Sequence, residues 1–150
     1  MVIADFGIIC LGQTECNYPN GTVDICFEVH RRLADSKAMY DNTYNFHTAD
    51  TLIGNWYFVW PKEEIMYEKP FFDIGPKGRP WVCVAREWRE TIRKVLEFYI
   101  CQSPEQKVAV LIREQDNSDN IVHPILKIDE FMSKLLSGNI RWNELYFIEK

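Results

Sequence analysis

The feature that most constrains the fold is an amphipathic helix followed directly by an apolar strand. From about Arg86 to Cys101, apolar side chains recur at the spacing of one helical face. These side chains are Trp88, Ile92, Val95, Leu96 and Tyr99. Pro104 ends the helix, and residues 108–112 then form an unbroken apolar run, typical of a strand buried on both faces. We therefore expect this helix to be the core helix, beside a buried strand.

The amino-terminal half carries further strand signals. Between residues 23 and 29, apolar and polar residues alternate as in a half-buried strand, and Asn20-Gly21 just before them is a strong turn signal. Together with the apolar run at residues 7–11, this pattern predicts an opening β-hairpin. Residues 52–60 are rich in aromatic and β-branched side chains and predict a central strand, with residues 64–67 as a candidate partner strand.

Turn residues and helix signals organise the carboxy-terminal half. Residues 69–80 hold three prolines and two glycines, so we expect a long surface loop there. Strands are expected at residues 81–85, 121–128 and 142–148, the second at a sheet edge because it contains Pro124. A second helix is expected to begin after Asp129, as its N-cap, and to end at Gly138.

The length of 150 residues is that of one domain. No repeat, linker or low-complexity tract divides the chain, so residues 1–150 are expected to form a single globular domain. The order of the predicted elements indicates an α+β (or mixed α/β) fold. We expect a roughly five- to six-stranded, mainly antiparallel sheet with two or three helices.

The amino terminus has no basic residue before its short apolar run, and no run of about 18 apolar residues occurs in the sequence. We therefore expect a cytoplasmic protein without a membrane-spanning segment. The five cysteines, at positions 10, 16, 26, 83 and 101, include no Cys-x-x-Cys pair. In a reducing compartment they are expected to be free and mostly buried, and whether any of them pair stays open.

The sequence contains no catalytic or metal-binding motif. Its three histidines, His30, His47 and His123, have no neighbouring ligand at helical spacing. Cys26 and His30 would be about 13 Å apart within one strand, too far for a thiolate–imidazole pair. Phosphate-loop, dinucleotide-binding and hydrolase patterns are also absent. We therefore predict no catalytic residue, no metal site and no cofactor.

A row of arginines runs along one flank of the predicted core helix. Arg86, Arg89 and Arg93 lie beside its apolar stripe, and three guanidinium groups are able to clamp a phosphate or a carboxylate. Glu90 and Glu97, however, lie one turn from Arg86 and Arg93, at the spacing of ion pairs on a solvated helix face. We expect such a solvated face.

The best candidate for a binding surface combines aromatic rings with carboxylates. Along the strand at residues 52–60, Trp60 is expected to point to one face and Tyr57 to the other, as in a buried strand. The following segment to residue 73 adds carboxylates to large rings. Aromatic anchors within an acidic rim suit a basic protein partner. The predicted partner-binding residues of this segment are Trp60, Glu63, Glu64, Tyr67, Glu68, Phe71 and Asp73.

A second, weaker candidate for partner binding lies at a predicted hairpin tip and consists of Glu114, Asp116 and Asp119. An ordinary solvated turn is the simpler interpretation of these three residues. Over the whole chain, 22 Asp and Glu against 17 Lys and Arg give a net charge of −5. Phosphate backbones and anionic membranes repel this charge. We therefore expect a basic protein partner, no direct contact with nucleic acid and no membrane contact, while the oligomeric state stays open.

The carboxy-terminal stretch carries a resemblance to a known class of proteins. Residues 128–138 (Ile-Asp-Glu-Phe-Met-Ser-Lys-Leu-Leu-Ser-Gly) and 140–146 (Ile-Arg-Trp-Asn-Glu-Leu-Tyr) form a short helix, a glycine stop and a returning strand. This ending is similar to those of the immunity proteins, of the contact-dependent inhibition type, that bacteria keep in the cytosol against toxins from neighbouring cells. The resemblance implies a cognate toxin domain, often a nuclease, that the protein binds and neutralises.

Two other classes of function stay open. In a small enzyme, the site would be assembled from distant residues, such as a carboxylate and His47 or His123 in an aromatic-lined cleft, because catalytic partners need to be close only in the fold. In a small-ligand-binding module, the many aromatic side chains would line a pocket. A histidine or cysteine in hydrogen-bond contact with a carboxylate inside a cleft would support the enzyme.

Overall fold

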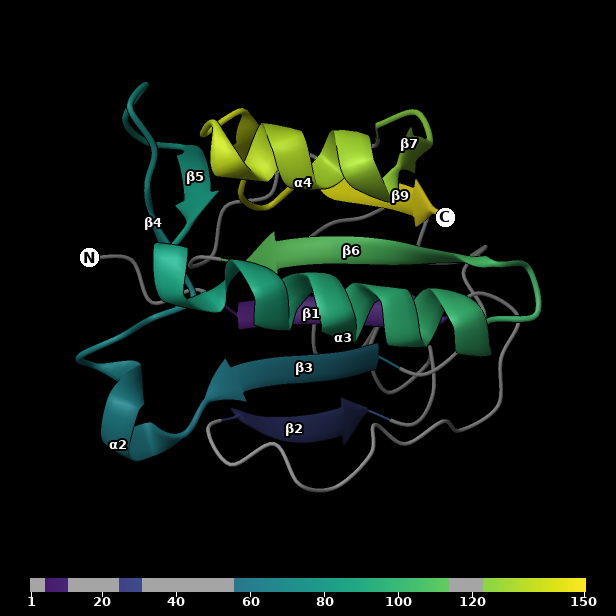
Figure 1. Cartoon of the computed structure of the whole chain (residues 1–150), viewed down its shortest axis with the longest axis horizontal. Helices are drawn as coiled ribbons and strands as arrows, with labels where there is room; N and C mark the ends of the chain where they lie inside the picture. Colours follow the sequence, from purple (N-terminus) through teal and green to yellow (C-terminus); the bar gives the residue numbers. More distant parts are fainter. Residues whose placement is uncertain (1–4, 11–24, 31–55, 114–122) are drawn as a thin grey trace.

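The computed structural model describes residues 5–10, 25–30, 56–113 and 123–150, and they form an α+β domain with two sheets (Figure 1). The larger sheet has six strands in the order β2-β3-β1-β6-β9-β7, and the smaller has three in the order β4-β5-β8. All the pairings are antiparallel except that of β7 with β9. The prediction of a mainly antiparallel α+β fold is therefore confirmed.

The strands are β1 (Asp5–Cys10), β2 (Ile25–His30), β3 (Trp56–Pro61), β4 (Phe72–Ile74), β5 (Trp81–Val84), β6 (Lys107–Arg113), β7 (Leu126–Lys127), β8 (Ile140–Arg141) and β9 (Leu145–Glu149). The helices are α2 (Glu63–Met66), α3 (Arg89–Gln102), which follows a 3₁₀ turn at Arg86–Trp88, and α4 (Ile128–Leu136). Both α3 and α4 lie on the same face of the larger sheet (Figure 1). No helix in the described part of the chain is long and apolar enough to cross a membrane.

The predicted core helix and apolar strand are both confirmed. The apolar stripe of α3 is fully buried against the sheet, and the ring of Tyr99 stacks on that of Tyr57 with centroids 4.6 Å apart. Strand β6 lies inside the larger sheet between β1 and β9, and residues 108–112 are all buried. Successive side chains of a strand point to opposite faces, so burial of all of residues 108–112 means that both faces of β6 are buried there, and this explains the unbroken apolar run.

The predicted opening hairpin is wrong. Strands β1 and β2 occupy the expected places in the sequence, but β3 lies between them and pairs with both. The candidate partner strand at residues 64–67 is also wrong, because α2 occupies Glu63–Met66. The alternation within β3 is correct: Tyr57 and Val59 face the core cluster, whereas Phe58 and Trp60 stack on each other with ring centroids 6.0 Å apart.

The smaller sheet and α4 depart from the predictions in detail. The expected loop at residues 69–80 contains β4, while the strand at 81–85 is confirmed as β5. The expected strand at 121–128 is reduced, in its described part, to β7 at the sheet edge. The N-cap of α4 is Lys127 instead of Asp129, which lies in the first turn and binds Arg93. The carboxylate of Asp129, which was expected to cap α4, thus forms a long-range ion pair with Arg93 instead.

Gly138 ends α4 in a left-handed conformation, with φ at +76°. The amide of Asn139 donates to the carbonyl of Lys134 at 2.8 Å, which closes the helix. A Cβ on Gly138 would lie 2.7 Å from Cδ of Pro76 and 3.2 Å from Cα of Gly75 in the turn between β4 and β5. The absence of a side chain at Gly138 therefore lets the smaller sheet approach the end of α4.

We predict that Gly138→Ala lowers the free energy of unfolding by about 2 kcal/mol, because the alanine combines backbone strain with this collision. Gly78→Ala is the matched control: Gly78 has φ at +77°, but a Cβ there meets nothing within 4 Å. Urea denaturation of the two variants separates strain from collision. Equal losses at both positions would contradict the tight contact between Gly138 and Pro76.

Candidate protein-binding surface

The most exposed aromatic side chain among the described residues follows α2. Tyr67 is 59% exposed, and the carboxylate of Glu68 beside it is also exposed. Most large aromatic side chains of the described core are buried, so this ring is an exception that packing does not explain. Tyr67 and Glu68 are two of the residues that the sequence predicts to bind a partner.

The backbone holds this exposed turn, Tyr67–Lys69, in place at both ends. The carbonyl of Ile65, whose side chain packs against the core, accepts the amides of Glu68 at 3.1 Å and Lys69 at 2.6 Å. The indole nitrogen of Trp88 donates to the carbonyl of Lys69 at 2.6 Å. The next residues, Pro70, Phe71 and Phe72, are buried. Tyr67 and Glu68 are therefore presented on a pre-organised turn, which lowers the entropy cost of binding.

Phe71 corrects one of the predicted binding residues. Its side chain is 1% exposed and meets the ring of Trp88 edge to face at 4.9 Å and that of Phe6 at 6.5 Å. A ring enclosed in this way does not reach a partner. The three prolines suggested a surface loop, but the chain turns inward at Pro70. The carbonyl of Phe71 accepts the amide of Ala85 at 2.7 Å, and Phe72, the first residue of β4, pairs with Val84 of β5 in the core.

The other predicted residues are distributed as follows. Trp60 is partly buried at the end of β3, and Glu63 and Glu64 lie in α2, where only their backbone is described. Asp73 is exposed on β4, but the buried Phe71 and Phe72 separate it along the chain from the Tyr67–Lys69 turn. Glu114, Asp116 and Asp119 lie outside the described residues. The structure therefore shows only part of the predicted surface.

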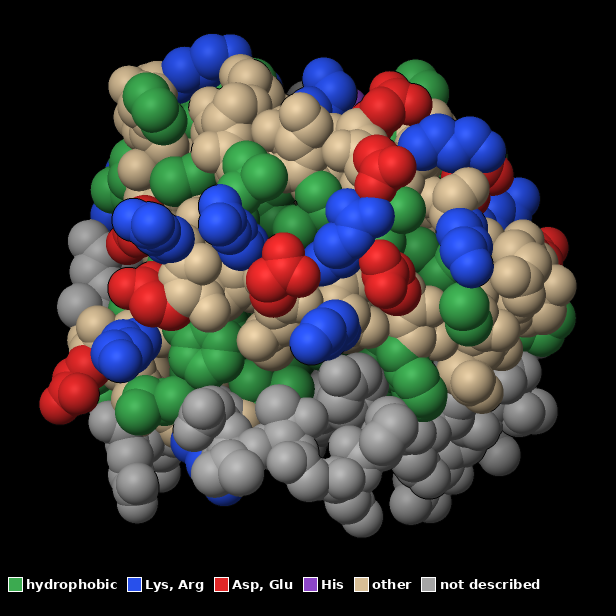
Figure 2. Space-filling model, viewed as in Figure 1, with side chains coloured by type: hydrophobic (Ala, Val, Ile, Leu, Met, Phe, Trp, Pro, Cys, Tyr) green, Lys and Arg blue, Asp and Glu red, His purple; other side chains and the backbone are tan. Residues whose placement is uncertain are grey.

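Acidic and basic residues balance each other in the described part of the chain, where their numbers are equal. Figure 2 shows this mixture over α3, where red and blue side chains alternate. The net charge of −5 is carried by the segments 11–24 and 114–122, through Glu15, Asp24, Glu114, Asp116 and Asp119. Close to Tyr67 in sequence, the exposed charged residues that the structure describes are Lys62, Glu68 and Lys69, so Glu68 is the carboxylate placed beside the ring.

A buried charge cluster joins the segment before β7 to β8 and β9. Glu144 is 1% exposed, and its Oε1 lies 2.6 Å from Nε2 of His123. Because the carboxylate accepts, the proton of the imidazole belongs on Nε2. Nε of Arg141 lies 3.1 Å from Oε2 of Glu144, an ion pair by distance, although the N–H does not point at that oxygen. One buried carboxylate thus meets two basic side chains.

Tyr146 completes this cluster. Its ring stacks on His123 with centroids 4.2 Å apart and planes 3° apart, and its hydroxyl accepts the amide of Arg141 at 2.9 Å. Burial, as the largest cause, raises the pKa of Tyr146 to about 12, so the phenol stays protonated as a neutral group. The amide of His123 also donates to the carbonyl of Leu145 at 2.9 Å. Three contacts therefore hold His123: this backbone hydrogen bond, the bond from Nε2 to Glu144 and the ring stack on Tyr146.

This cluster supplies the histidine–carboxylate contact that an enzyme requires, but its geometry favours a structural role. Glu144 is too deeply buried to touch a substrate, and Tyr146 covers one face of the His123 ring. The sequence pointed to His123 only as a general possibility and missed Glu144. A charged residue between the apolar Trp142 and Tyr146 was the available signal, because a buried carboxylate needs a basic partner. His47 lies outside the described residues.

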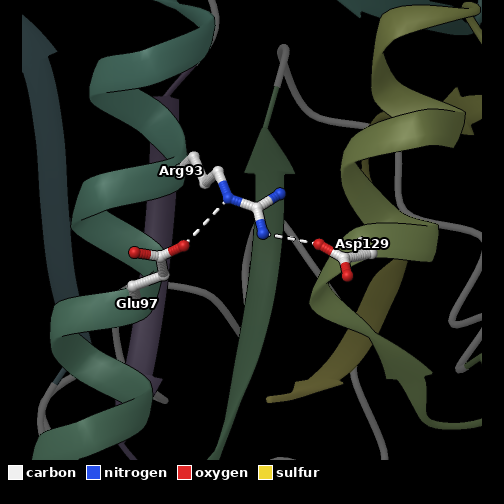
Figure 3. Close-up of polar contacts among 3 residues, drawn as sticks. All are labelled: Arg93, Glu97 and Asp129. Atoms are coloured by element: carbon white, nitrogen blue, oxygen red, sulfur yellow. Dashed lines mark hydrogen bonds and ion pairs between the residues drawn. The ribbon is translucent and has the colours of Figure 1, made fainter.

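Arg93 is tied to carboxylates on two helices (Figure 3). Its Nε donates to Glu97 at 2.9 Å, as the i, i+4 spacing predicts, and an Nη donates to Asp129 of α4 at 2.5 Å. The hydrogen bond that the guanidinium donates to Asp129, as the largest cause, raises the pKa of Arg93. Arg93 is therefore occupied as a link between α3 and α4 and does not serve as part of a three-arginine anion clamp.

The thiols and metal ligands of the described residues show no catalytic arrangement. Cys83 is partly buried and free, and burial, followed by the charge of Asp73 on the paired strand, raises the pKa of its thiol. This change makes the thiol less reactive. Cys101 is free and exposed at the end of α3. Within the residues that the structure describes, no group of three His, Cys, Asp or Glu is placed to hold a metal ion.

Comparison with known proteins does not assign this chain to a family. No family model, no curated protein and no solved structure matches this chain.

Proposed function

We propose that this protein is an immunity-type inhibitor that binds and neutralises a cognate toxin domain in the cytosol. The observation that carries the proposal is the exposed side chain of Tyr67, which is held beside Glu68 on a turn fixed to the core. Aromatic side chains of this kind supply most of the energy at protein interfaces, and carboxylates beside them steer a basic partner. A small basic domain, such as a nuclease domain, fits this chemistry.

Phe71 contributes to this surface indirectly. Its burial, together with the hydrogen bond from Trp88 to Lys69, fixes where Tyr67 stands. The proposed contact residues on the described surface are therefore Tyr67 and Glu68, with Glu63 and Glu64 of α2 beside them in sequence. A rigid, partly apolar turn of this kind binds with less loss of side-chain entropy than a free loop.

The direct test is complex formation with a probe of defined origin. The proposal requires a gene immediately upstream that encodes a large secreted protein with a small basic carboxy-terminal domain, and that domain is the probe. We expect an equimolar complex on size-exclusion chromatography, and we expect its association rate to fall as salt rises, because opposite charges steer the encounter. Absence of a complex at micromolar concentrations would contradict the proposal.

We predict that Tyr67→Ala combined with Glu68→Lys weakens this complex about 30-fold or more, because the pair removes an interfacial aromatic anchor and reverses its neighbouring charge. Both side chains are exposed, so the fold is expected to stay intact. Glu105→Lys is the matched control, since Glu105 is exposed in the connection between α3 and β6. Titration calorimetry on the three proteins measures the effect, and equal affinities would place the interface elsewhere.

A further inference from the structure

The arginine row consists of Arg86, in the 3₁₀ turn before α3, and Arg89 and Arg93 of α3, and it lies on the side of α3 toward α4. Arg93 reaches Asp129 across the two helices, and Arg89 precedes it by four residues, so both lie on the same flank of α3. The two helices run in opposite directions side by side (Figures 1 and 3). The turns of α3 before Arg93 therefore face the turns of α4 that follow Asp129, up to Leu136 at the end of that helix.

Arg86 and Arg89 differ from Arg93 in having no carboxylate partner. Both side chains are exposed, and no carboxylate in the described part of the chain lies within 4.0 Å of either guanidinium. The ion pair of Arg86 with Glu90, which the i, i+4 spacing suggested, does not form. Within the described part of the chain, two exposed guanidinium groups one turn apart are therefore without an ion pair and able to bind an anion.

An exposed apolar side chain, Leu136, lies at the carboxyl end of α4, which is next to the amino end of α3. Leu136 is 49% exposed, which is high for a leucine on the flank of a core helix that faces another helix. Figure 2 shows a row of Lys and Arg side chains along the α4 side of α3, with hydrophobic side chains visible beside it. We call Arg86, Arg89 and Leu136 the interhelical face.

The Arg93 link makes this face rigid. Because Arg93 binds Glu97 on its own helix and Asp129 on the other, the spacing between α3 and α4 is fixed one turn away from Arg89. A partner therefore meets two arginines and one leucine whose backbone positions are fixed relative to each other. Such pre-organisation favours a specific contact over diffuse charge attraction.

We infer that the interhelical face docks an acidic segment of a partner protein, with carboxylates on Arg86 and Arg89 and an apolar side chain against Leu136. Arginine forks match carboxylates in pairs, and the leucine requires an apolar counterpart that a phosphate backbone lacks. This face differs in charge and position from the Tyr67–Lys69 turn, so the inference stands independently of the proposed function.

The probe is a synthetic peptide of about 12 residues, made of glutamates with two leucines four positions apart so that both lie on one helical face. We expect it to shift the amide NMR signals of Arg86, Arg89 and Leu136. We expect Arg86→Glu with Arg89→Glu to weaken the peptide about tenfold or more, and Leu136→Ser to weaken it several-fold. A peptide with serine in place of both leucines should lose affinity for the wild type but not for Leu136→Ser.

Lys94→Glu with Lys134→Glu is the matched control. Both lysines are exposed on the same two helices, and Lys134, two positions before Leu136, points to the opposite side of α4. This control should keep the affinity of the wild type within about twofold. The inference is overturned if the control weakens the peptide as much as the arginine pair does. It is equally overturned if the peptide fails to bind at millimolar concentration, or if a single-stranded oligonucleotide binds the face more tightly than the peptide.

Discussion

Phe71→Ala is expected to lower the free energy of unfolding by about 3–5 kcal/mol, the usual cost of removing a fully buried aromatic ring. The ring is 1% exposed, and its edge-to-face contacts with Trp88, Phe72 and Phe6 all depend on its presence. Neighbouring side chains are unable to fill the space, because they are fixed by β4, β5 and the 3₁₀ turn before α3. Urea denaturation followed by tryptophan fluorescence measures the loss.

Tyr67→Ala gives the contrast within the same segment. Tyr67 precedes Phe71 by four residues but is 59% exposed, so its replacement should change the free energy of unfolding by less than about 1 kcal/mol. The two variants therefore separate the roles of two aromatic residues that look equivalent in the sequence. If Phe71→Ala were as mild as Tyr67→Ala, the assignment of Phe71 to the core would be wrong.

The same pair separates stability from binding. Phe71→Leu keeps an apolar side chain in the core and should retain affinity for the toxin domain while it remains folded, because the ring does not touch the partner. Tyr67→Ala should lose affinity while remaining stable. A loss of affinity in a fully folded Phe71→Leu protein would show that Phe71 does more than support the Tyr67–Lys69 turn.

The parts of the fold that the sequence predicted are those that local patterns determine. The helix at Arg89–Gln102 follows from the 3.6-residue spacing of its apolar side chains, and β6 follows from a continuous apolar run. The prediction that residues 7–11 and 23–29 form a hairpin failed, because a turn signal such as Asn20-Gly21 predicts where the chain turns but not which strands pair. The insertion of β3 between β1 and β2 is a long-range event.

The candidate site was predictable only in part for the same reason. Exposure of Tyr67 and Glu68 agrees with the aromatic and acidic pattern, whereas burial of Phe71 depends on the pairing of β4 with β5. The link from Arg93 to Asp129 joins residues 36 positions apart, so sequence spacing showed only its partner Glu97. The smaller sheet contains strands of two to four residues, too short for a period-2 pattern to be recognised.

Glu144→Gln is expected to lower the free energy of unfolding by about 3 kcal/mol. Removing one member of a buried ion pair leaves the other charge without compensation, and the usual cost is about 3–5 kcal/mol. We place this variant at the lower end, because the side chains of Arg141 and His123 are each 32% exposed and water is able to solvate them in part. Urea denaturation at neutral pH is the measurement.

Glu149→Gln on the neighbouring strand β9 is the matched control. Glu149 pairs with Lys127 at 2.9 Å, but Lys127 is exposed and Glu149 is partly exposed, so the loss of this pair should cost less than about 1 kcal/mol. A double variant, Glu144→Leu with Arg141→Leu, tests the cause: it should be less destabilised than Glu144→Gln, because no uncompensated charge remains at Arg141. If the double variant were the least stable, packing and not charge would explain the position of His123 over Tyr146. The cluster would then hold β7 to β9 mainly through the 4.2 Å ring stack.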